Sequence, residues 1–310
     1  MNRIRAKSGV LLGALVSGAL ASGAIGGAAP AQASCFSIFG LGNGNGCTSN
    51  LSTYAIAIGD GAVASATGLF GGSLAIGDNA QATMASLSLS SFNFATAIGN
   101  NAIAQGFASL FGIALQFGPG TAATLGVADI AVGINQGAGQ QAAVSGIGSI
   151  AIQLGSGSSN NFGGFNVAVG VGGDTATGGV ANLALNLLGN SLTSASGTLN
   201  AAVNVLSDDN VVSAGSASPN SVLNLAVAAF GKGNTVSAGP GPLAFAGSIF
   251  QRGATVTKVG PGFNINGLAV PGVASVQRRS VTPAAATAAA TAQHPTAKSV
   301  SPRTPRKTTR

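Results

Sequence analysis

A degenerate unit of about twenty residues recurs between residues 54 and 270. Each copy contains a short alternating segment, a turn with Gly, Asn or Asp, and an Ala/Ser/Gly-rich return. The clearest copies are 57–68 (AIGDGAVASATG), 75–83 (AIGDNAQAT) and 97–106 (AIGNNAIAQG). A period in this range is typical of stacked arrays, in which each unit contacts only its neighbours. The repeat therefore predicts one elongated domain rather than two globular ones.

Bulky residues alternate with small or amide-bearing residues in successive copies. Ile113, Leu115 and Phe117, for example, alternate with Ala114 and Gln116. A period of two indicates a strand with one face inward. We expect the bulky residues to face the core, and the small and amide residues to form an opposite face that is either stacked closely or lined by side-chain amide ladders. The alternation recurs at Ile130, Val132 and Ile134, at Ile150, Ile152 and Leu154, at Val167, Val169 and Val171, and at Leu183, Leu185 and Leu187.

Turn-forming residues follow the alternating segments. Gly, Asn and Asp tolerate a positive φ or bond their own backbone, so they favour tight turns. Three inward bulky residues would contribute about 5–9 kcal/mol, against roughly 20–40 kcal/mol of backbone entropy for one unit, so a unit folds only when stacked. We therefore predict an all-β fold, a β-solenoid or parallel β-roll of about ten or eleven short coils over 54–274. The repeat-turn residues are Gly59, Asp60, Gly77, Asp78, Gly99 and Asn100.

The first 33 residues have the pattern of a secretory signal peptide. Arg3, Arg5 and Lys7 precede an apolar run over 10–25, and 31–33 (AQA) is a small-x-small cleavage pattern. We expect cleavage between Ala33 and Ser34, with no transmembrane segment afterwards. The alternatives are an uncleaved anchor and, less favoured, a lipoprotein. The predicted location is outside the cell or on the envelope surface of a bacterium.

Two cysteines in a secreted chain predict one disulfide. Cys35 and Cys47 would close a loop around the glycine-rich segment 40–46 and form an N-terminal cap over 34–53. Such a loop contributes about 3 kcal/mol. A metal pair is the alternative, but His294 is the single histidine and lies in the C-terminal segment.

Catalytic patterns are sparse in this sequence. The chain is 6% charged and contains no Glu, and Asp208 and Asp209 are its only adjacent carboxylates. Neighbouring turn residues point apart, which disfavours general acid–base chemistry. The segment 231–234 (GKGN) has only half of a phosphate-binding loop pattern. We therefore expect no enzyme activity, no metal and no cofactor.

The segment 275–310 is basic and rich in Pro, Thr and Ala, which predicts a disordered tail. Its cations could contact an anionic polymer of the cell wall or of a host surface. The alternative is a tail that only aids solubility, and nucleic-acid binding is not expected in a secreted chain without interleaved aromatic residues. The basic residues are Arg278, Arg279, Lys298, Arg303, Arg306, Lys307 and Arg310.

The three clearest copies resemble the AIGxxAxAxG head repeats of trimeric autotransporter adhesins of the YadA type. The resemblance covers about 54–106 and implies a left-handed parallel β-roll, with each Ala-Ile-Gly step as an inward strand leading into a turn. Those steps correspond to 57–59, 75–77 and 97–99. Because 275–310 is polar and basic, we expect neither the heptad stalk nor the membrane anchor of that family here. The composition also resembles secreted Gly/Ala-rich proteins of actinobacteria such as mycobacteria.

A repeat without evident chemistry predicts a structural or adhesive protein, secreted or on the cell surface. The alternative is a self-assembling matrix or fibre subunit, because open strand edges and Asn/Gln faces can template further strands. Self-association as a trimer or a fibre is therefore a second expectation.

Overall fold

The computed structural model describes residues 34–44, 46–85, 92–137, 139–218, 220–270 and 274–278, without side chains from 269 onward. These residues form strands and turns, with no helix among them. The segment 1–33 and all residues after Arg278 lie outside the described residues. The signal peptide and most of the basic tail therefore remain predictions.

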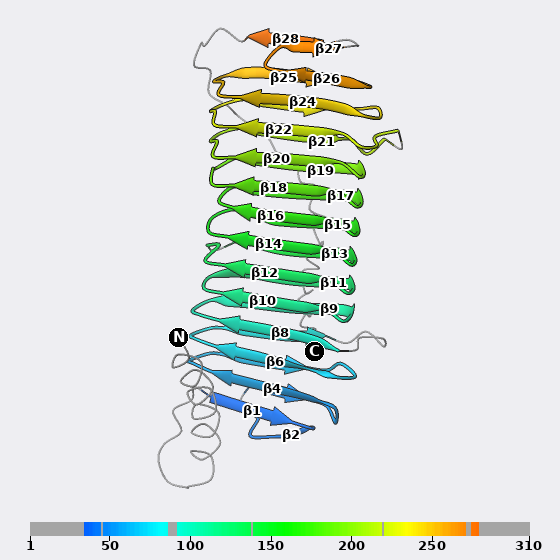
Figure 1. Ribbon diagram of the computed structural model, residues 1–310. Helices are drawn as coiled ribbons and strands as arrows, with labels where there is room; N and C mark the ends of the chain where they lie inside the picture. The colour runs from blue at the N-terminus through cyan, green and yellow to red at the C-terminus, as the bar shows by residue number, and fades with distance from the viewer. Residues whose placement is uncertain are drawn as a thin grey trace, which may run out of the picture. The chain divides into compact units, whose positions relative to one another are not determined.

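The strands form two sheets on opposite sides of one stack of coils (Figure 1). Sheet A has 15 strands and sheet B has 13. Sheet A contains β1 (Ser34–Ile38), β2 (Leu41–Gly42), β4 (Thr53–Ile58), β6 (Gly71–Ile76), β8 (Asn93–Ile98), β10 (Ile113–Phe117), β12 (Ile130–Ile134), β14 (Ile150–Leu154), β16 (Val167–Val171), β18 (Leu183–Leu187), β20 (Ala201–Val205), β22 (Leu225–Ala229), β24 (Ala244–Ile249), β26 (Gly262–Ile265) and β27 (Leu268–Val270). Sheet B contains β3 (Cys47–Ser49), β5 (Val63–Ala66), β7 (Gln81–Ala85), β9 (Ala102–Leu110), β11 (Gly120–Val127), β13 (Gln141–Ile147), β15 (Ser159–Gly164), β17 (Asp174–Val180), β19 (Leu192–Thr198), β21 (Val211–Gly215), β23 (Thr235–Ala238), β25 (Ala254–Lys258) and β28 (Ala274–Arg278).

Successive coils stack as parallel strands in register. Ala114 of β10 pairs with Ala131 of β12, and Ala131 pairs in turn with Ala151 of β14. The chain alternates between the sheets, so each coil adds one strand to each of them (Figure 1). This arrangement confirms the predicted all-β solenoid, with about twelve coils instead of ten or eleven.

Both ends of the stack carry antiparallel strands. At one end β1 pairs antiparallel with β4 and with the two-residue strand β2. At the other end β27 pairs antiparallel with β26, and β28 with β25. β28 spans Ala274–Arg278 and therefore includes the first four residues of the segment 275–310. Three of the four described edge strands, β2, β3 and β27, have only two or three residues, which disfavours end-to-end strand addition.

The predicted disulfide joins the two sheets at the N-terminal end. Cys35 lies in β1 and Cys47 in β3, with their Cα atoms 5.5 Å apart. Both cysteines are buried. The bridge therefore ties the antiparallel cap strand to the first strand of sheet B.

The core contradicts the expected orientation of the strands. The small residues face inward, and the bulky residues of sheet A face outward. A fully buried column of alanines runs through nine consecutive strands of sheet A, from β8 to β24. We call it the alanine column: Ala95, Ala114, Ala131, Ala151, Ala168, Ala184, Ala202, Ala226 and Ala246. In the copies that resemble adhesin heads, Ala57, Ala75 and Ala97 are likewise buried, and the isoleucine of each Ala-Ile-Gly step points outward.

Short connections between the sheets explain this orientation. β9 ends at Leu110 and β10 begins at Ile113, so only Phe111 and Gly112 carry the chain from sheet B to sheet A. Sheets whose large side chains interdigitate lie about 10 Å apart. A corner this tight holds the sheets closer together at this side of the coil, and only small inward residues fit there. Because the space between the sheets is narrow there, Ala faces inward although Ile, Leu and Val are more hydrophobic.

Amide ladders line the interior at this corner. The Oδ1 atom of Asn166 accepts a hydrogen bond from the backbone N–H of Asn182 at 2.8 Å, and Asn182 accepts one from Asn200 at 2.9 Å. Asn200 does the same for Asn224 at 2.8 Å. The amide ladders that we expected on the outer surface therefore lie inside, where they satisfy backbone groups that water cannot reach.

Candidate functional site

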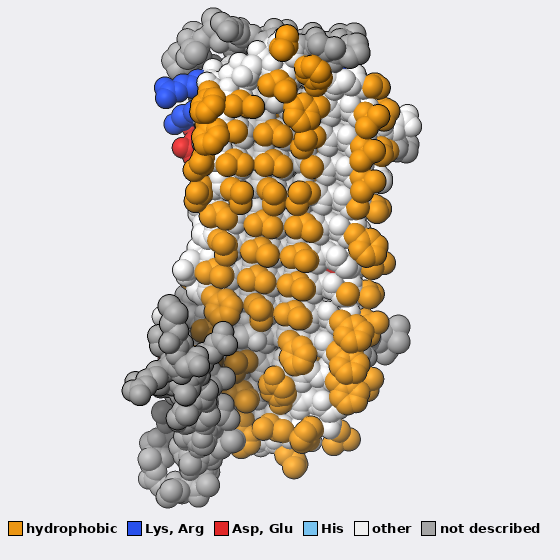
Figure 2. Space-filling model, in the orientation of Figure 1, with side chains coloured by type: hydrophobic (Ala, Val, Ile, Leu, Met, Phe, Trp, Pro, Cys, Tyr) orange, Lys and Arg blue, Asp and Glu red, His pale blue; other side chains and the backbone are white. Residues whose placement is uncertain are grey.

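The outer surface of sheet A is an extended array of apolar side chains (Figure 2). Three outward positions in each five-residue strand form three columns that run along the stack. We call the outward residues of β4 to β24 in sheet A the apolar face. Its side chains are half-buried or exposed: Tyr54, Ile56, Ile58, Leu74, Ile76, Phe94, Thr96, Ile98, Ile113, Leu115, Phe117, Ile130, Val132, Ile134, Ile150, Ile152, Leu154, Val167, Val169, Val171, Leu183, Leu185, Leu187, Ala201, Val203, Val205, Leu225, Val227, Ala229, Phe245 and Ile249.

The parallel register places like residues one above another in these columns. Val132 pairs with Ile152, Ile152 with Val169, and Val169 with Leu185. None of the described residues of this face is charged. An apolar surface that continues over so many strands is larger than the scattered exposed hydrophobic residues of ordinary soluble proteins.

Exposed aromatic and aliphatic residues at the corners extend the apolar face. The rings of Phe70 and Phe92 are stacked with centroids 5.2 Å apart, and Phe92 stacks on Phe111 at 5.1 Å. At the other corner Phe230 and Phe250 stack at 5.0 Å. Four of these residues have φ between 54° and 64°, an uncommon conformation for a bulky side chain: Phe92, Phe111, Phe230 and Phe250.

The outer surface of sheet B has a different character. One of its outward columns consists of small and polar residues from β7 to β25. Ala176 of β17 pairs with Ser194 of β19, and Ser194 pairs with Ser213 of β21. Its other outward columns include exposed apolar residues such as Leu125, Ile147 and Phe162, so the outer surface of sheet B is mixed, whereas that of sheet A is continuously apolar.

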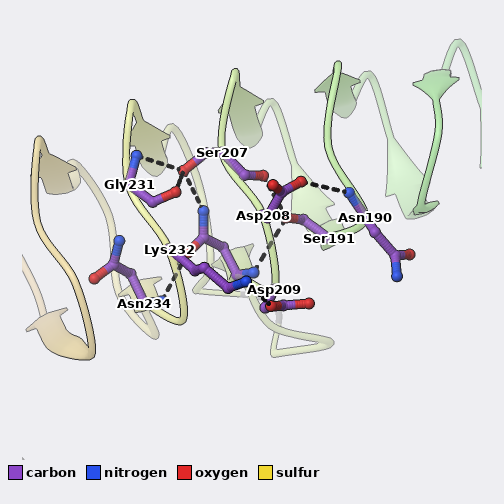
Figure 3. A network of polar contacts seen from close by, with 9 residues as sticks. Asn190, Ser191, Ser207, Asp208, Asp209, Gly231, Lys232 and Asn234 are labelled. Carbon is purple, nitrogen blue, oxygen red and sulfur yellow. Dashed lines mark hydrogen bonds and ion pairs between the residues drawn. The ribbon is translucent and has the colours of Figure 1, made fainter.

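The charged residues of one turn region neutralise each other or bond the backbone (Figure 3). Lys232 Nζ lies 3.2 Å from Asp209 Oδ2, and both side chains are more than half exposed. Asp208 Oδ1 accepts a hydrogen bond from the backbone N–H of Asn190 at 3.3 Å. The backbone N–H of Gly231 donates to Ser207 Oγ at 2.9 Å.

The Asp208–Asp209 pair and the segment 231–234 therefore take part in contacts within this turn region. The two adjacent aspartates point to different partners, and Lys232 pairs with a carboxylate. Within the described residues no group of three or more His, Cys, Asp or Glu side chains is arranged to hold a metal. The same residues contain no helix that could cross a bilayer.

Asp129 is the one fully buried carboxylate among the described residues. Its Oδ1 atom accepts a hydrogen bond from the backbone N–H of Ser149 at 3.0 Å, whereas its Oδ2 atom has no partner within the described part of the chain. Burial raises the pKa of this carboxyl above its usual value, and backbone hydrogen bonds from Ser149 and Gly146 oppose the rise. Its environment favours the protonated form.

The predicted turn residues lie where sheet A passes into sheet B. The Oδ1 atom of Asp78 accepts a hydrogen bond from the backbone N–H of Asp60, and the Oδ1 atom of Asn100 accepts one from Asp78, each at 3.2 Å. Gly59, preceding Asp60, has φ +134°, and a Cβ there would lie 2.3 Å from the carbonyl oxygen of Gly77. Gly77 and Gly99 have the same conformation, with φ of 124° and 120°. The glycines allow neighbouring turns to stack closely.

The structure says less about the remaining predicted residues. Ser34 begins β1, and Arg278 ends β28, where side chains are not described. The others lie outside the described residues: Ala33, Arg279, Lys298, Arg303, Arg306, Lys307 and Arg310.

Sequence reasoning missed the apolar face because it assigned these residues to the core. One feature of the sequence indicates which residues face inward. In the alanine column nine successive strands have the same side chain, whereas the adjacent outward column varies from Gly247 to Leu185. A tightly packed interior needs uniform volume, and an outer surface does not. Comparison of the chain with protein-family models, with curated proteins and with solved structures gave no match.

Proposed function

We propose that this chain is a secreted or cell-surface structural protein that makes adhesive contacts through its apolar face and catalyses no reaction. The observation that supports the proposal most strongly is the apolar face itself, which continues over eleven strands from β4 to β24. The signal-like segment 1–33 and the Cys35–Cys47 disulfide agree with an oxidising compartment.

The size of the face makes many weak contacts sufficient for adhesion. Ten spacings of about 4.8 Å and a strand length of about 16 Å give an area of about 770 Å². At about 25 cal/mol per Å², complete burial yields about 19 kcal/mol. Association costs about 4–15 kcal/mol, so a well-matched apolar partner binds with a net gain.

The alternative of a fibre built end to end has less support. Both ends of the stack carry antiparallel strands, and the outermost strand of sheet A at the N-terminal end has only two residues. The resemblance of β4, β6 and β8 to adhesin-head repeats favours the adhesive role. The sideways contact surface is also more extensive than either end.

Adsorption to coated beads tests the adhesive role. We expect the full chain to adsorb to octyl-coated beads, to remain bound in 1 M NaCl, and to be released by a non-ionic detergent. Salt strengthens apolar contacts and screens ionic ones, so this pattern identifies the apolar face as the contact. The double variant Val169→Asp/Leu185→Asp should lose most of the adsorption.

Ala176→Asp/Ser194→Asp is the matched control, because it places the same two charges on paired residues of the outer surface of sheet B. It should adsorb like the unmodified chain. Binding only to anionic beads, with release by salt, would assign adhesion to the basic segment 278–310 instead. Recovery of the chain only from the cytosol, with residues 1–33 still attached, would contradict the proposed location.

A further inference from the structure

We infer that the apolar face binds a second copy of this chain in a twofold, face-to-face pair. The inference rests on the proposed use of this face as a contact surface, and it names the partner. The first argument is area. The face covers about 770 Å², and a stable protein interface buries about 800 Å² on each partner. One partner of the same size therefore suffices to cover it, and an apolar bead surface competes with this partner for the same face.

The second argument is the spacing of the side chains. The columns of the apolar face repeat at the spacing of neighbouring strands, about 4.8 Å. Leu115, Val132 and Ile152 occupy successive steps of one column. A second copy presents ridges and grooves with the same period, so the side chains of the two faces interdigitate along the whole stack. Paired sheets with matching lattices form dry interfaces of this kind.

The third argument is the shape of the face. The strands of sheet A keep nearly the same direction through the stack (Figure 1), and the three columns form a broad, even surface (Figure 2). Another even surface covers all three columns at once. Three copies around a common axis would each present the face to two neighbours and leave part of it in water, so a pair is favoured over a trimer.

The fourth argument is the difference between the two outer surfaces. Sheet B exposes Ser194, Ser213 and Ser237, as expected for a surface in water. Sheet A has Leu185, Val203 and Val227 at comparable positions on the same coils. The other outward columns of sheet B are mixed and include the exposed residues Leu125, Ile147 and Phe162, so only sheet A has apolar columns that continue through the stack. Pairing through sheet A buries these continuous apolar columns and leaves the mixed surface of sheet B outside.

The pairing makes a residue-specific prediction. β14 is the middle strand of the apolar face between β4 and β24, and Ile152 is its central outward residue. In a centred twofold pair this position faces its own counterpart, because a twofold axis brings equivalent residues together. Since the described residues contain no free cysteine, a single cysteine at this position reports on the contact.

The experiment measures the mass of the full oxidised chain by light scattering at micromolar concentration. We expect twice the mass of one chain, and the mass of one chain for Val169→Asp. Ala176→Asp should keep the doubled mass, and far-UV circular dichroism should show that both variants retain their strands. Under mild oxidation Ile152→Cys should form a disulfide-linked pair, whereas Ala176→Cys should not.

A mass equal to one chain for the unmodified protein would overturn the inference. If that monomer still adsorbed to octyl-coated beads, the proposed adhesive function would stand with a different partner. A mass of three chains would overturn the twofold pair. A doubled mass that Val169→Asp leaves unchanged would place the contact elsewhere and would also overturn the inference.

Discussion

Asp129 is an acidic residue at a position that other coils fill with amides or hydroxyls. Ser149, Asn166 and Asn182 follow it in the corner ladder, and each accepts a hydrogen bond from the backbone N–H of the next coil. In Asn166 and Asn182 the Nδ2 group also donates to backbone carbonyls. Asp129 cannot donate in this way when it is ionised, and its Oδ2 atom has no partner among the described residues. An amide would suit the position better.

We therefore predict that Asp129→Asn stabilises the fold at neutral pH. The pKa of Asp129 is raised in the folded state, so the folded protein binds this proton more tightly than the unfolded chain does. Stability is full below the usual value of 3.8 and is lost as pH rises from there through the raised pKa. Thermal unfolding at pH 7 should show a gain of about 1–3 kcal/mol for the variant, with a smaller pH dependence above pH 4.

Asp60→Asn is the control for this prediction. Asp60 lies in an exposed turn, so its replacement should leave the melting temperature at pH 7 unchanged. A loss of stability for Asp129→Asn at pH 7 would mean that the ionised carboxylate stabilises the fold.

Volume, rather than hydrophobicity, decides which residues face inward. Ala168 is fully buried, while Val169 beside it is half-buried on the outside. The sequence predicted the strands, the turns and the stacking from alternation, because a period of two identifies two faces. It did not predict which face is inside, because that depends on how far apart short corners hold the two sheets. Hydrophobic residues are common on protein surfaces, so apolarity alone does not identify a core.

At the level of the strands, interior space is shared between neighbouring coils. Gln116 and Gln153 are buried at inward positions where the coils beside them have Gly133 and Gly170. A Cβ at Gly170 would lie 2.1 Å from Gln153 Oε1. Each large amide therefore occupies space that the neighbouring glycine leaves open. A single strand does not reveal this compensation, because it appears only when the register of two coils is known.

The N-terminal cap is an element whose disulfide the sequence predicted correctly. Replacing Cys35 and Cys47 by Ser should lower the free energy of unfolding by about 3 kcal/mol, because the bridge restricts the unfolded chain. In a stack with contacts only between neighbours, the loss should be greatest near β1, β3 and β4. Hydrogen exchange should therefore accelerate there and change little in β16 to β20.

Reduction of the unmodified chain is the matched control, and it should reproduce the pattern of the double variant. Uniform acceleration through all coils would show instead that the stack unfolds as one cooperative unit. Unchanged exchange in β1 to β4 would show that the bridge contributes nothing to the cap.

At the scale of the whole described unit, a sheet with a continuous apolar outer face and a sheet with a mixed outer surface enclose a narrow interior. The apolar face supports adhesion or pairing, whereas the charged residues of the turn around Lys232 satisfy one another. Sequence patterns indicated a repeat protein without evident chemistry, but they placed the contact residues in the core. The proposed contact surface became recognisable only when the direction of each side chain was known.

Two identical substitutions at adjacent residues test the central claim most directly. Ala168→Asp puts a carboxylate into the interior without a partner, which costs several kcal/mol. Val169→Asp puts the same group on the outer surface, where it costs about 1 kcal/mol in strand preference. Circular dichroism with thermal unfolding should show native strands and cooperative unfolding for Val169→Asp, and loss of both for Ala168→Asp. The opposite result, with Ala168→Asp folded and Val169→Asp unfolded, would show that the bulky residues form the core and would contradict the account.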